Sequence, residues 1–211
     1  MAVEEPLEIR IENRSIAIVM RTPGHDKELT AGFLLSEGAI KSSKEIFEIS
    51  ECINQSKDEK EIGNYVDVIL TDNSDFNFEN LTRHVFTSSS CGVCGKATLD
   101  SVMTEFEKIQ KTKKISPENI LNLPEKLLLV QETFKKTGGL HASALFDENG
   151  EIVIIREDVG RHNALDKVIG YALLNNMLPL ENHILLLSGR ISFELMQKSL
   201  AAGIPTIAGI S

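Results

Sequence analysis

The pattern of hydrophobic and polar positions in the first half of the chain predicts short strands around one helix. Apolar and polar residues alternate over several short runs, as expected for strands with one buried face. Leu29, Phe33 and Leu34 instead follow helical spacing, in a segment that Asp26 is expected to cap. The expected elements are strands over residues 7–11, 15–21, 44–53, 62–70 and 83–87, a helix from Asp26 to Gly38, and a helix over about 96–110.

The second half of the chain alternates more regularly between strands and helices. Pro124 is expected to open a helix that Gly138-Gly139 ends, because proline suits the first helical turn and glycine the residue after the last. A turn over residues 147–150 predicts a hairpin. The remaining expected elements are hairpin strands over 141–146 and 152–156, helices over 162–175 and 192–202, and strands over 184–187 and 204–210.

This alternation predicts a mixed α/β fold with layered sheets. Residues 88–116 contain a run of small residues and a lysine-rich stretch, which is typical of a connection. The sequence therefore divides into an N-terminal αβ subdomain (1–87), a connecting segment (88–116) and a C-terminal α/β domain (117–211).

Composition and charge narrow the class of protein. The chain has 211 residues, of which 42% are hydrophobic and 25% charged, as in ordinary globular proteins. Its net charge of -9 disfavours a general nucleic-acid binder, which needs a basic face. The sequence has no apolar run long enough to span a membrane and no signal-like start, so we expect a soluble, cytoplasmic protein.

The sequence Cys91-Gly-Val-Cys94 is the strongest candidate for chemistry. In a reducing cytosol such a pair is more often chemical than structural. Gly92 and Gly95 leave the sulfur atoms unshielded, and the helix expected to follow brings its N-terminal amides and the charge of Lys96 close. These features lower the pKa of a thiol and favour sulfur or redox chemistry.

A zinc site is the main alternative for this cysteine pair. Zinc needs four ligands, and the sequence has no second Cys-x-x-Cys, so Cys52 and His84 would have to complete the site. A deaminase-type zinc site is disfavoured because Ser143 stands where His141 would require a glutamate two residues later. A plain turn of two small residues is the third interpretation.

Two Gly-Arg turns are candidate anion sites. Gly160-Arg161 and Gly189-Arg190 each follow a predicted strand and precede a predicted helix, so each places an arginine beside free helix N-terminal amides. If the two strands are neighbours, both arginines flank one phosphorylated ligand. Additional hydrogen bonds are expected from His162, Asn163 and Ser192. The alternative is that the arginines merely pair with Glu157, Asp158 or Glu194.

Five ordered blocks of sequence, spread over nearly the whole chain, form a specific combination. They are Thr30-Ala31-Gly32-Phe33-Leu34-Leu35-Ser36-Glu37-Gly38, Ser89-Ser90-Cys91-Gly92-Val93-Cys94-Gly95, Thr137-Gly138-Gly139-Leu140-His141-Ala142-Ser143, Glu157-Asp158-Val159-Gly160-Arg161-His162-Asn163-Ala164-Leu165-Asp166-Lys167, and Leu187-Ser188-Gly189-Arg190 with Ala202-Gly203-Ile204-Pro205. Together they resemble the FdhD family of formate dehydrogenase accessory sulfurtransferases.

The resemblance implies both a fold and a role. It implies a homodimer whose C-terminal domain is a cytidine-deaminase-like, three-layer α/β domain, and a family pattern that continues past residue 211, so this domain is expected to be truncated. It further implies a sulfur carrier that takes persulfide sulfur from a cysteine desulfurase. The sulfur passes to molybdenum in the bis-molybdopterin guanine dinucleotide cofactor, which formate dehydrogenase requires, and GDP is expected to mimic that cofactor.

Cys91 matches the persulfide-bearing cysteine of the family, and Cys94 matches its partner. The leading hypothesis is therefore a sulfurtransferase that acts through Cys91 and binds a nucleotide-type anion near residues 160–163 and 189–192. Cys94 is expected either to relay the sulfur or to release it as sulfide while forming a disulfide. The alternatives are a zinc-binding regulatory module, and a guanine-nucleotide-binding protein in which the cysteine pair is a redox switch.

Overall fold

Two four-stranded sheets and five α-helices make up the described part of the chain. The computed structural model describes residues 2–52, 64–72, 74, 76, 78, 106, 108, 109 and 115–210. The strands are β1 (Glu5–Ile11), β2 (Arg14–Arg21), β3 (Ile46–Cys52), β4 (Tyr65–Leu70), β5 (His141–Phe146), β6 (Ile152–Asp158), β7 (Ile184–Leu187) and β8 (Thr206–Gly209). The helices are α1 (Asp26–Ser36), α3 (Pro117–Val130), α4 (Glu132–Thr137), α5 (Arg161–Leu174) and α6 (Phe193–Ala201), with a 3-10 helix, η1 (Ser43–Glu45).

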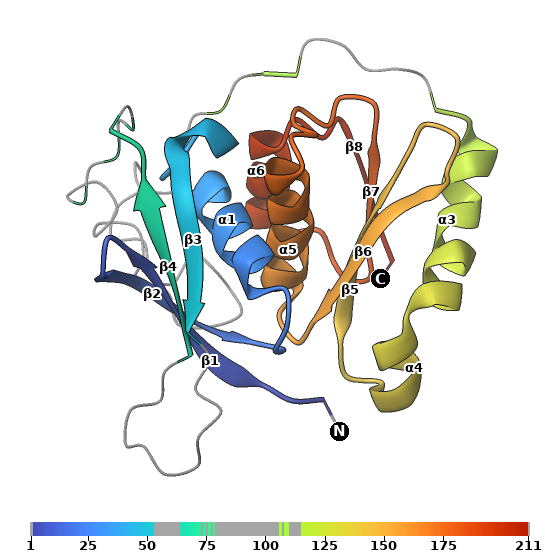
Figure 1. Ribbon diagram of the computed structural model, residues 1–211. Coiled ribbons are helices and arrows are strands. Elements are labelled where there is room, and N and C mark those ends of the chain that lie inside the picture. Colours follow the sequence, from blue (N-terminus) through green and yellow to red (C-terminus); the bar gives the residue numbers. More distant parts are fainter. Residues whose placement is uncertain are drawn as a thin grey trace.

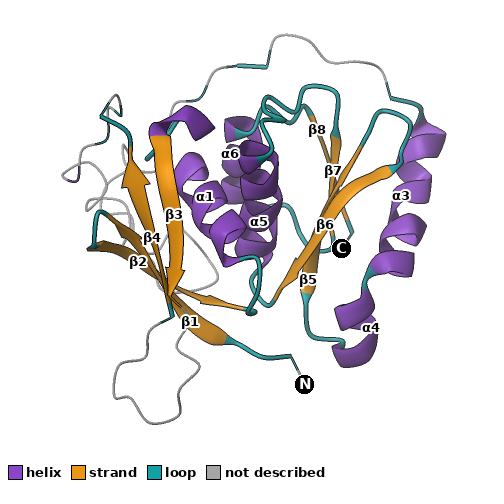
Figure 2. Cartoon of the chain, viewed as in Figure 1, coloured by secondary structure: helices purple, strands orange, loops and turns teal. Residues whose placement is uncertain are grey.

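The sheets and helices form layers. The first sheet has the order β2-β1-β4-β3 and the second β6-β5-β7-β8, and each contains one parallel pair, β1 with β4 and β7 with β8. Helices α1 and α5 lie between the two sheets, and α3 covers the outer face of the second sheet (Figures 1 and 2). The predicted mixed α/β class is confirmed.

Most predicted elements form close to their predicted bounds, but three details were wrong. The helix expected to run to Gly138 is divided at Gln131 into α3 and α4. Pro117, not Pro124, opens α3, and Pro124 lies inside the helix, which continues because Leu123 and Leu127 are fully buried against the second sheet. Asp26 does not cap α1. It is the first helical residue, and its carboxylate accepts two hydrogen bonds from the buried Arg21, at 3.0 and 2.8 Å.

Two glycines allow α1 and α5 to touch backbone to backbone. A Cβ atom at Gly32 would overlap with the carbonyl group of Asp166, and one at Gly170 would overlap with that of Glu28. Each glycine therefore faces the main chain of the other helix, where no side chain fits. The crossing fixes how closely the two helices, and the sheets on either side of them, approach.

One apolar cluster joins the two halves of the sequence. It contains residues of β1 and α1, such as Ile9 and Leu34, together with residues of α5 and β7, such as Leu165 and Leu185. The ion pair between Arg156 of β6 and Glu28 of α1 (2.5 Å between Nε and Oε2) adds a polar link. The division at residues 87 and 117 remains a prediction.

Several sequence predictions fall outside the described residues. They are the strand over 83–87, most of the helix over 96–110, and both members of the cysteine pair, Cys91 and Cys94. The described residues of that helix range, 106, 108 and 109, are not helical. Within the described ranges, no helix is long and apolar enough to cross a membrane.

The glycine crossing gives a stability prediction. Gly32→Ala is expected to lower the free energy of unfolding by at least about 2 kcal/mol, because its methyl group forces two packed helix backbones apart. Gly139→Ala is the control, since a Cβ there meets nothing closer than 3.8 Å. Urea unfolding of the two variants checks the prediction, and equal unfolding midpoints would contradict it.

Candidate functional site

The predicted anion-binding residues gather at one edge of the second sheet. Strands β6 and β7 end at this edge, and β5 begins there, with His141 paired to Asp158 in the ladder. The strands that precede the two Gly-Arg turns, β6 and β7, are not neighbours, because β5 lies between them. The condition under which the sequence placed both arginines beside one ligand is therefore not met. The intervening strand places His141 between the turns instead.

The first turn leads into α5. Gly160 is the N-cap residue, and the first helical hydrogen bond runs from the Ala164 N–H to the Gly160 carbonyl group (2.9 Å). The amides of residues 161–163 precede that bond and are therefore open to an acceptor. The Asn163 side chain is held by the Met20 carbonyl group (2.7 Å) and by Asp158 Oδ1 (3.1 Å).

Gly160 is tightly enclosed in this turn. A Cβ atom there would lie 3.0 Å from Asn163 Nδ2 and 3.5 Å from Asp158 Oδ1. The Gly160 N–H also donates to Asp158 Oδ1 (2.8 Å). Asp158 is fully buried, and its other oxygen lies 2.7 Å from Lys167 Nζ and accepts the Thr22 N–H (3.0 Å).

The second turn leads into α6. Ser192 caps this helix, because its hydroxyl accepts the Leu195 N–H at 3.4 Å. A Cβ atom at Gly189 would lie 3.3 Å from Nδ1 of His141, so the glycine lets the imidazole ring pack against the turn. From the start of β5 the ring thus lies against the second turn, and the charge of Arg161 in the first turn acts on its pKa.

Neither arginine is paired with the acidic residues considered from the sequence. Among the described residues, Arg161 and Arg190 make no ion pair or side-chain hydrogen bond. The nearby carboxylates are engaged elsewhere: Glu157 accepts the N–H groups of Thr133 and Phe134, Asp158 binds Lys167, and Glu194 contacts His162. Each arginine thus lies beside a helix N-terminus without an acidic partner in the described part of the chain, which suits an anionic ligand.

Two histidines at this edge are held neutral. Burial, followed by the charges of Lys198 and Arg161, lowers the pKa of His162 from 6.5 to about 4. Burial and Arg161 also lower the pKa of His141. Nε2 of His162 lies 3.0 Å from Glu194 Oε2, so this contact is a hydrogen bond from a neutral ring and not an ion pair at neutral pH.

A buried ionic cluster joins Lys198 of α6 to Asp166 of α5 and to the C-terminal end of α1. Lys198 contacts Asp166 Oδ2 at 2.9 Å and Glu37 Oε1 at 3.3 Å, and its ammonium donates to Ser36 Oγ (2.7 Å). Burial lowers the pKa of Lys198, but the two carboxylates more than offset this, so the net shift is upward. Lys198 therefore stays charged and helps to keep His162 neutral.

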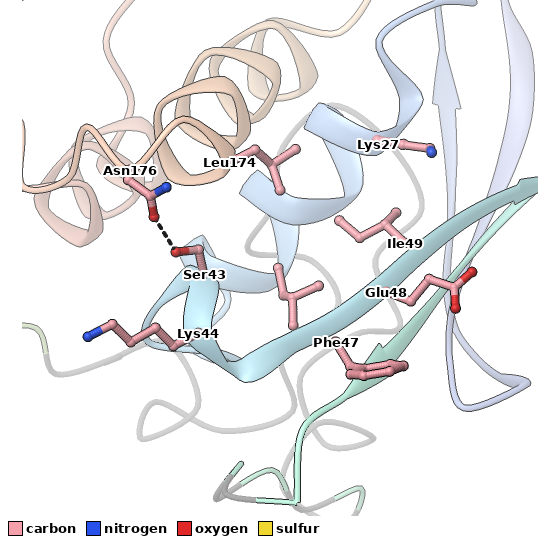
Figure 3. Close-up of a pocket in the computed structure, with 9 residues that line it drawn as sticks. Lys27, Ser43, Lys44, Phe47, Glu48, Ile49, Leu174 and Asn176 are labelled. Atoms are coloured by element: carbon pink, nitrogen blue, oxygen red, sulfur yellow. Dashed lines mark hydrogen bonds between the residues drawn. The ribbon is translucent and has the colours of Figure 1, made fainter.

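A separate pocket of about 490 Å³ lies near the opposite end of α5 (Figure 3). It is lined by parts of α1, η1 and β3, by Leu174 and by Asn176, whose side-chain oxygen accepts a hydrogen bond from the Ser43 hydroxyl (2.9 Å). None of the predicted site residues lines it. A helix of 14 residues is about 21 Å long, so this pocket is distant from the Gly-Arg turns.

The sequence analysis considered His141 only as part of a deaminase-type zinc site, which Ser143 disfavours. The structure leaves its ring half-buried and without a hydrogen bond to any described residue. The predicted hairpin could have located His141 at the site. When the pairing of β5 with β6 is continued to the end of both strands, His141 lies opposite Asp158. Within the described ranges, no group of His, Cys, Asp and Glu can hold a metal ion, and the zinc alternative for Cys91 and Cys94 lies outside them.

The lowered pKa of His162 predicts a loss of stability in acid. Between pH 6.5 and about 4 the unfolded chain takes up a proton on this residue that the folded chain does not, so the stability falls as the pH falls. His162→Gln is expected to lose less stability than the parent between about pH 7 and about pH 5 in urea unfolding. His25→Gln, at an exposed position, is the control. An equal fall for the parent and His162→Gln would contradict the prediction.

Comparison with known proteins shows which family the chain is similar to. The model of the FdhD/NarQ family matches residues 2–211. Proteins named "Sulfur carrier protein FdhD" are 48% identical in Streptomyces coelicolor, over 100% of this chain and 76% of that protein, and 44% identical in Sulfolobus acidocaldarius, over 100% and 77%.

A solved structure shares the fold. The crystal structure described as a formate dehydrogenase accessory protein from Desulfotalea psychrophila is similar with a TM-score of 0.74 and 26% identity, over 99% of this chain and 75% of that one. A family match over essentially the whole chain and relatives at this level of identity agree with each other. The chain belongs to the FdhD/NarQ family.

Proposed function

We propose that this protein is a sulfur carrier that delivers persulfide sulfur to the molybdenum of a bis-molybdopterin guanine dinucleotide cofactor, its substrate. The names of the relatives support the sulfur-carrier role. The molybdenum cofactor is proposed as the sulfur acceptor because the resemblance to the FdhD family implies it. The observation that carries the proposal is the site at the sheet edge, where Arg161 and Arg190 have no acidic partner among the described residues. A nucleotide substrate supplies the missing negative charge.

The proposed chemistry moves one sulfur atom through Cys91. The Cys91 thiolate attacks the terminal sulfur of a donor persulfide, the donor cysteine leaves as a thiolate, and Cys91 becomes the persulfide. In delivery the S–S bond breaks so that Cys91 is again a thiolate, and the zero-valent terminal sulfur bonds to the molybdenum of the substrate. The molybdenum is proposed to be in a reduced state and to supply the two electrons that make the sulfur a sulfido ligand. Cys94 is proposed to act as its partner, either holding the sulfur or competing for it.

The Gly-Arg site is proposed to hold the phosphate groups of the substrate. Free amides at the start of α5 and the guanidinium groups of Arg161 and Arg190 are suitable donors for phosphate oxygens. The neutral rings of His141 and His162 are suited to hydrogen bonds with uncharged groups, because neither carries a charge at neutral pH. The anchored substrate would then receive sulfur from the cysteine segment.

The partners follow from the same proposal. A cysteine desulfurase is the proposed sulfur donor, and formate dehydrogenase is the proposed recipient of the sulfurated cofactor. A homodimer and a cytoplasmic location remain predictions.

Sulfur loading tests the carrier residue. After incubation with a desulfurase and cysteine, the intact mass of the chain is expected to rise by about one sulfur atom, reversibly with reductant, because a persulfide forms. Cys91→Ser is expected to abolish this gain and Cys52→Ser, at a half-buried position of β3, to leave it unchanged. Undiminished loading of Cys91→Ser would show that another residue carries the sulfur.

Nucleotide binding tests the anion site. Arg161→Gln and Arg190→Gln are each expected to weaken GDP binding at least about tenfold, because each removes a charge-assisted hydrogen bond. Arg14→Gln, at an exposed position at the start of β2, is the matched control. Isothermal titration calorimetry provides the affinities, and unchanged affinity in both site variants would place the nucleotide elsewhere.

A further inference from the structure

Helix α3 is apolar on two opposite faces. Its inner face buries Leu123 and Leu127 against the second sheet. On the other side Leu121, Leu128 and Leu129 are 77%, 52% and 67% exposed. A helix on a protein surface normally shows polar residues there, and a helix that is apolar all round is normally covered.

The exposed side chains form a regular stripe, which we call the outer stripe: Glu118, Leu121, Glu125 and Leu128, with Leu129 beside it. The spacings of three, four and three residues place the stripe within an arc of about 100°, because each residue advances the helix by about 100°. The stripe lies opposite the inner face, which packs on the second sheet, so it points away from that sheet. Figure 1 shows α3 on the outer side of the second sheet. No packing within the described chain accounts for these leucines.

The charges of the outer stripe are all negative. Glu118 and Glu125 form no ion pair or hydrogen bond with a described residue. The cation on the same helix, Lys126, is already engaged by the Gly150 carbonyl group (2.5 Å) and by Glu151 (2.6 Å). Lys135 of α4 donates to the Leu129 carbonyl group at the end of the helix (2.9 Å).

From these observations we infer that the outer stripe of α3 is a docking surface for a basic amphipathic helix of a partner protein. Leucines spaced as in a helix–helix seam suit an apolar stripe on the partner, and the unpaired glutamates between them suit lysine or arginine. Charge complementarity of this kind sets both the partner and its register.

A second copy of this chain is the less suitable occupant. Two outer stripes in contact would bring glutamate against glutamate, because the stripe carries no cation of its own. The net charge of -9 adds to this repulsion. The inference concerns the outward face of α3, which contains none of the predicted site residues, and it does not depend on the proposed function.

Two synthetic helical peptides test the inference with the full chain. Both carry leucine at seam spacing, one with lysine and one with glutamate at the flanking positions, and binding is followed by fluorescence anisotropy. The parent chain is expected to bind the lysine peptide at least about tenfold more tightly than the glutamate peptide, and less tightly as salt rises. Leu128→Ser is expected to weaken this binding at least about tenfold.

Charge reversal makes the test specific. Glu125→Lys is expected to invert the preference, so that the glutamate peptide binds more tightly. Ile18→Ser, at a position of β2 that is 63% exposed, is the matched control and is expected to leave binding unchanged. Circular dichroism checks that each variant is folded. The inference is overturned if the lysine peptide does not bind, or if neither Leu128→Ser nor Glu125→Lys changes its affinity. It is also overturned if sedimentation shows that Leu128→Ser converts a dimer of this chain to monomers.

Discussion

The direct backbone contact between α1 and α5 is the constraint on which the rest of the structure depends. Gly32 and Gly170 let the two helices approach so closely that neither position has room for a side chain. This contact joins the first sheet to the second and brings the end of β2 to the start of α5. As a result, the Met20 carbonyl group positions Asn163, and the N–H group of Thr22 positions Asp158. The N-terminal half thus helps to build a site whose candidate ligand groups lie in the C-terminal half.

The buried lysines determine how charge is distributed around this site. The fully buried Asp158 is neutralised by Lys167, and the buried Asp166 by Lys198. Since these carboxylates are already used, Arg161 is left without an acidic partner among the described residues. The Gly-Arg turns of an acidic protein thereby keep arginines that no described carboxylate neutralises, whereas we infer that Glu125 and its neighbours select what docks on α3.

The sequence predicted the elements better than their contacts. The sequence located β7 at its observed bounds and α5 within one residue of its observed bounds, because a four-residue apolar run and the start of a helix after a Gly-Arg turn are local signals. It failed at Pro124, where burial of the neighbouring leucines overrides the local cost of proline in a helix. It also left open whether the two Gly-Arg strands are neighbours, since strand order depends on long-range pairing that no local pattern encodes. His141 consequently became a site residue only when β5 was found between them.

The central claim is that one residue carries the sulfur and another part of the chain anchors its acceptor. It is tested most directly by preloading the chain with labelled sulfur and following transfer to the molybdenum cofactor in a single turnover. The account predicts that a chain with both Arg161→Gln and Arg190→Gln retains as much label as the parent but passes it on at least about tenfold more slowly. Transfer at the parental rate from that double variant would show that the acceptor is not anchored by the Gly-Arg turns.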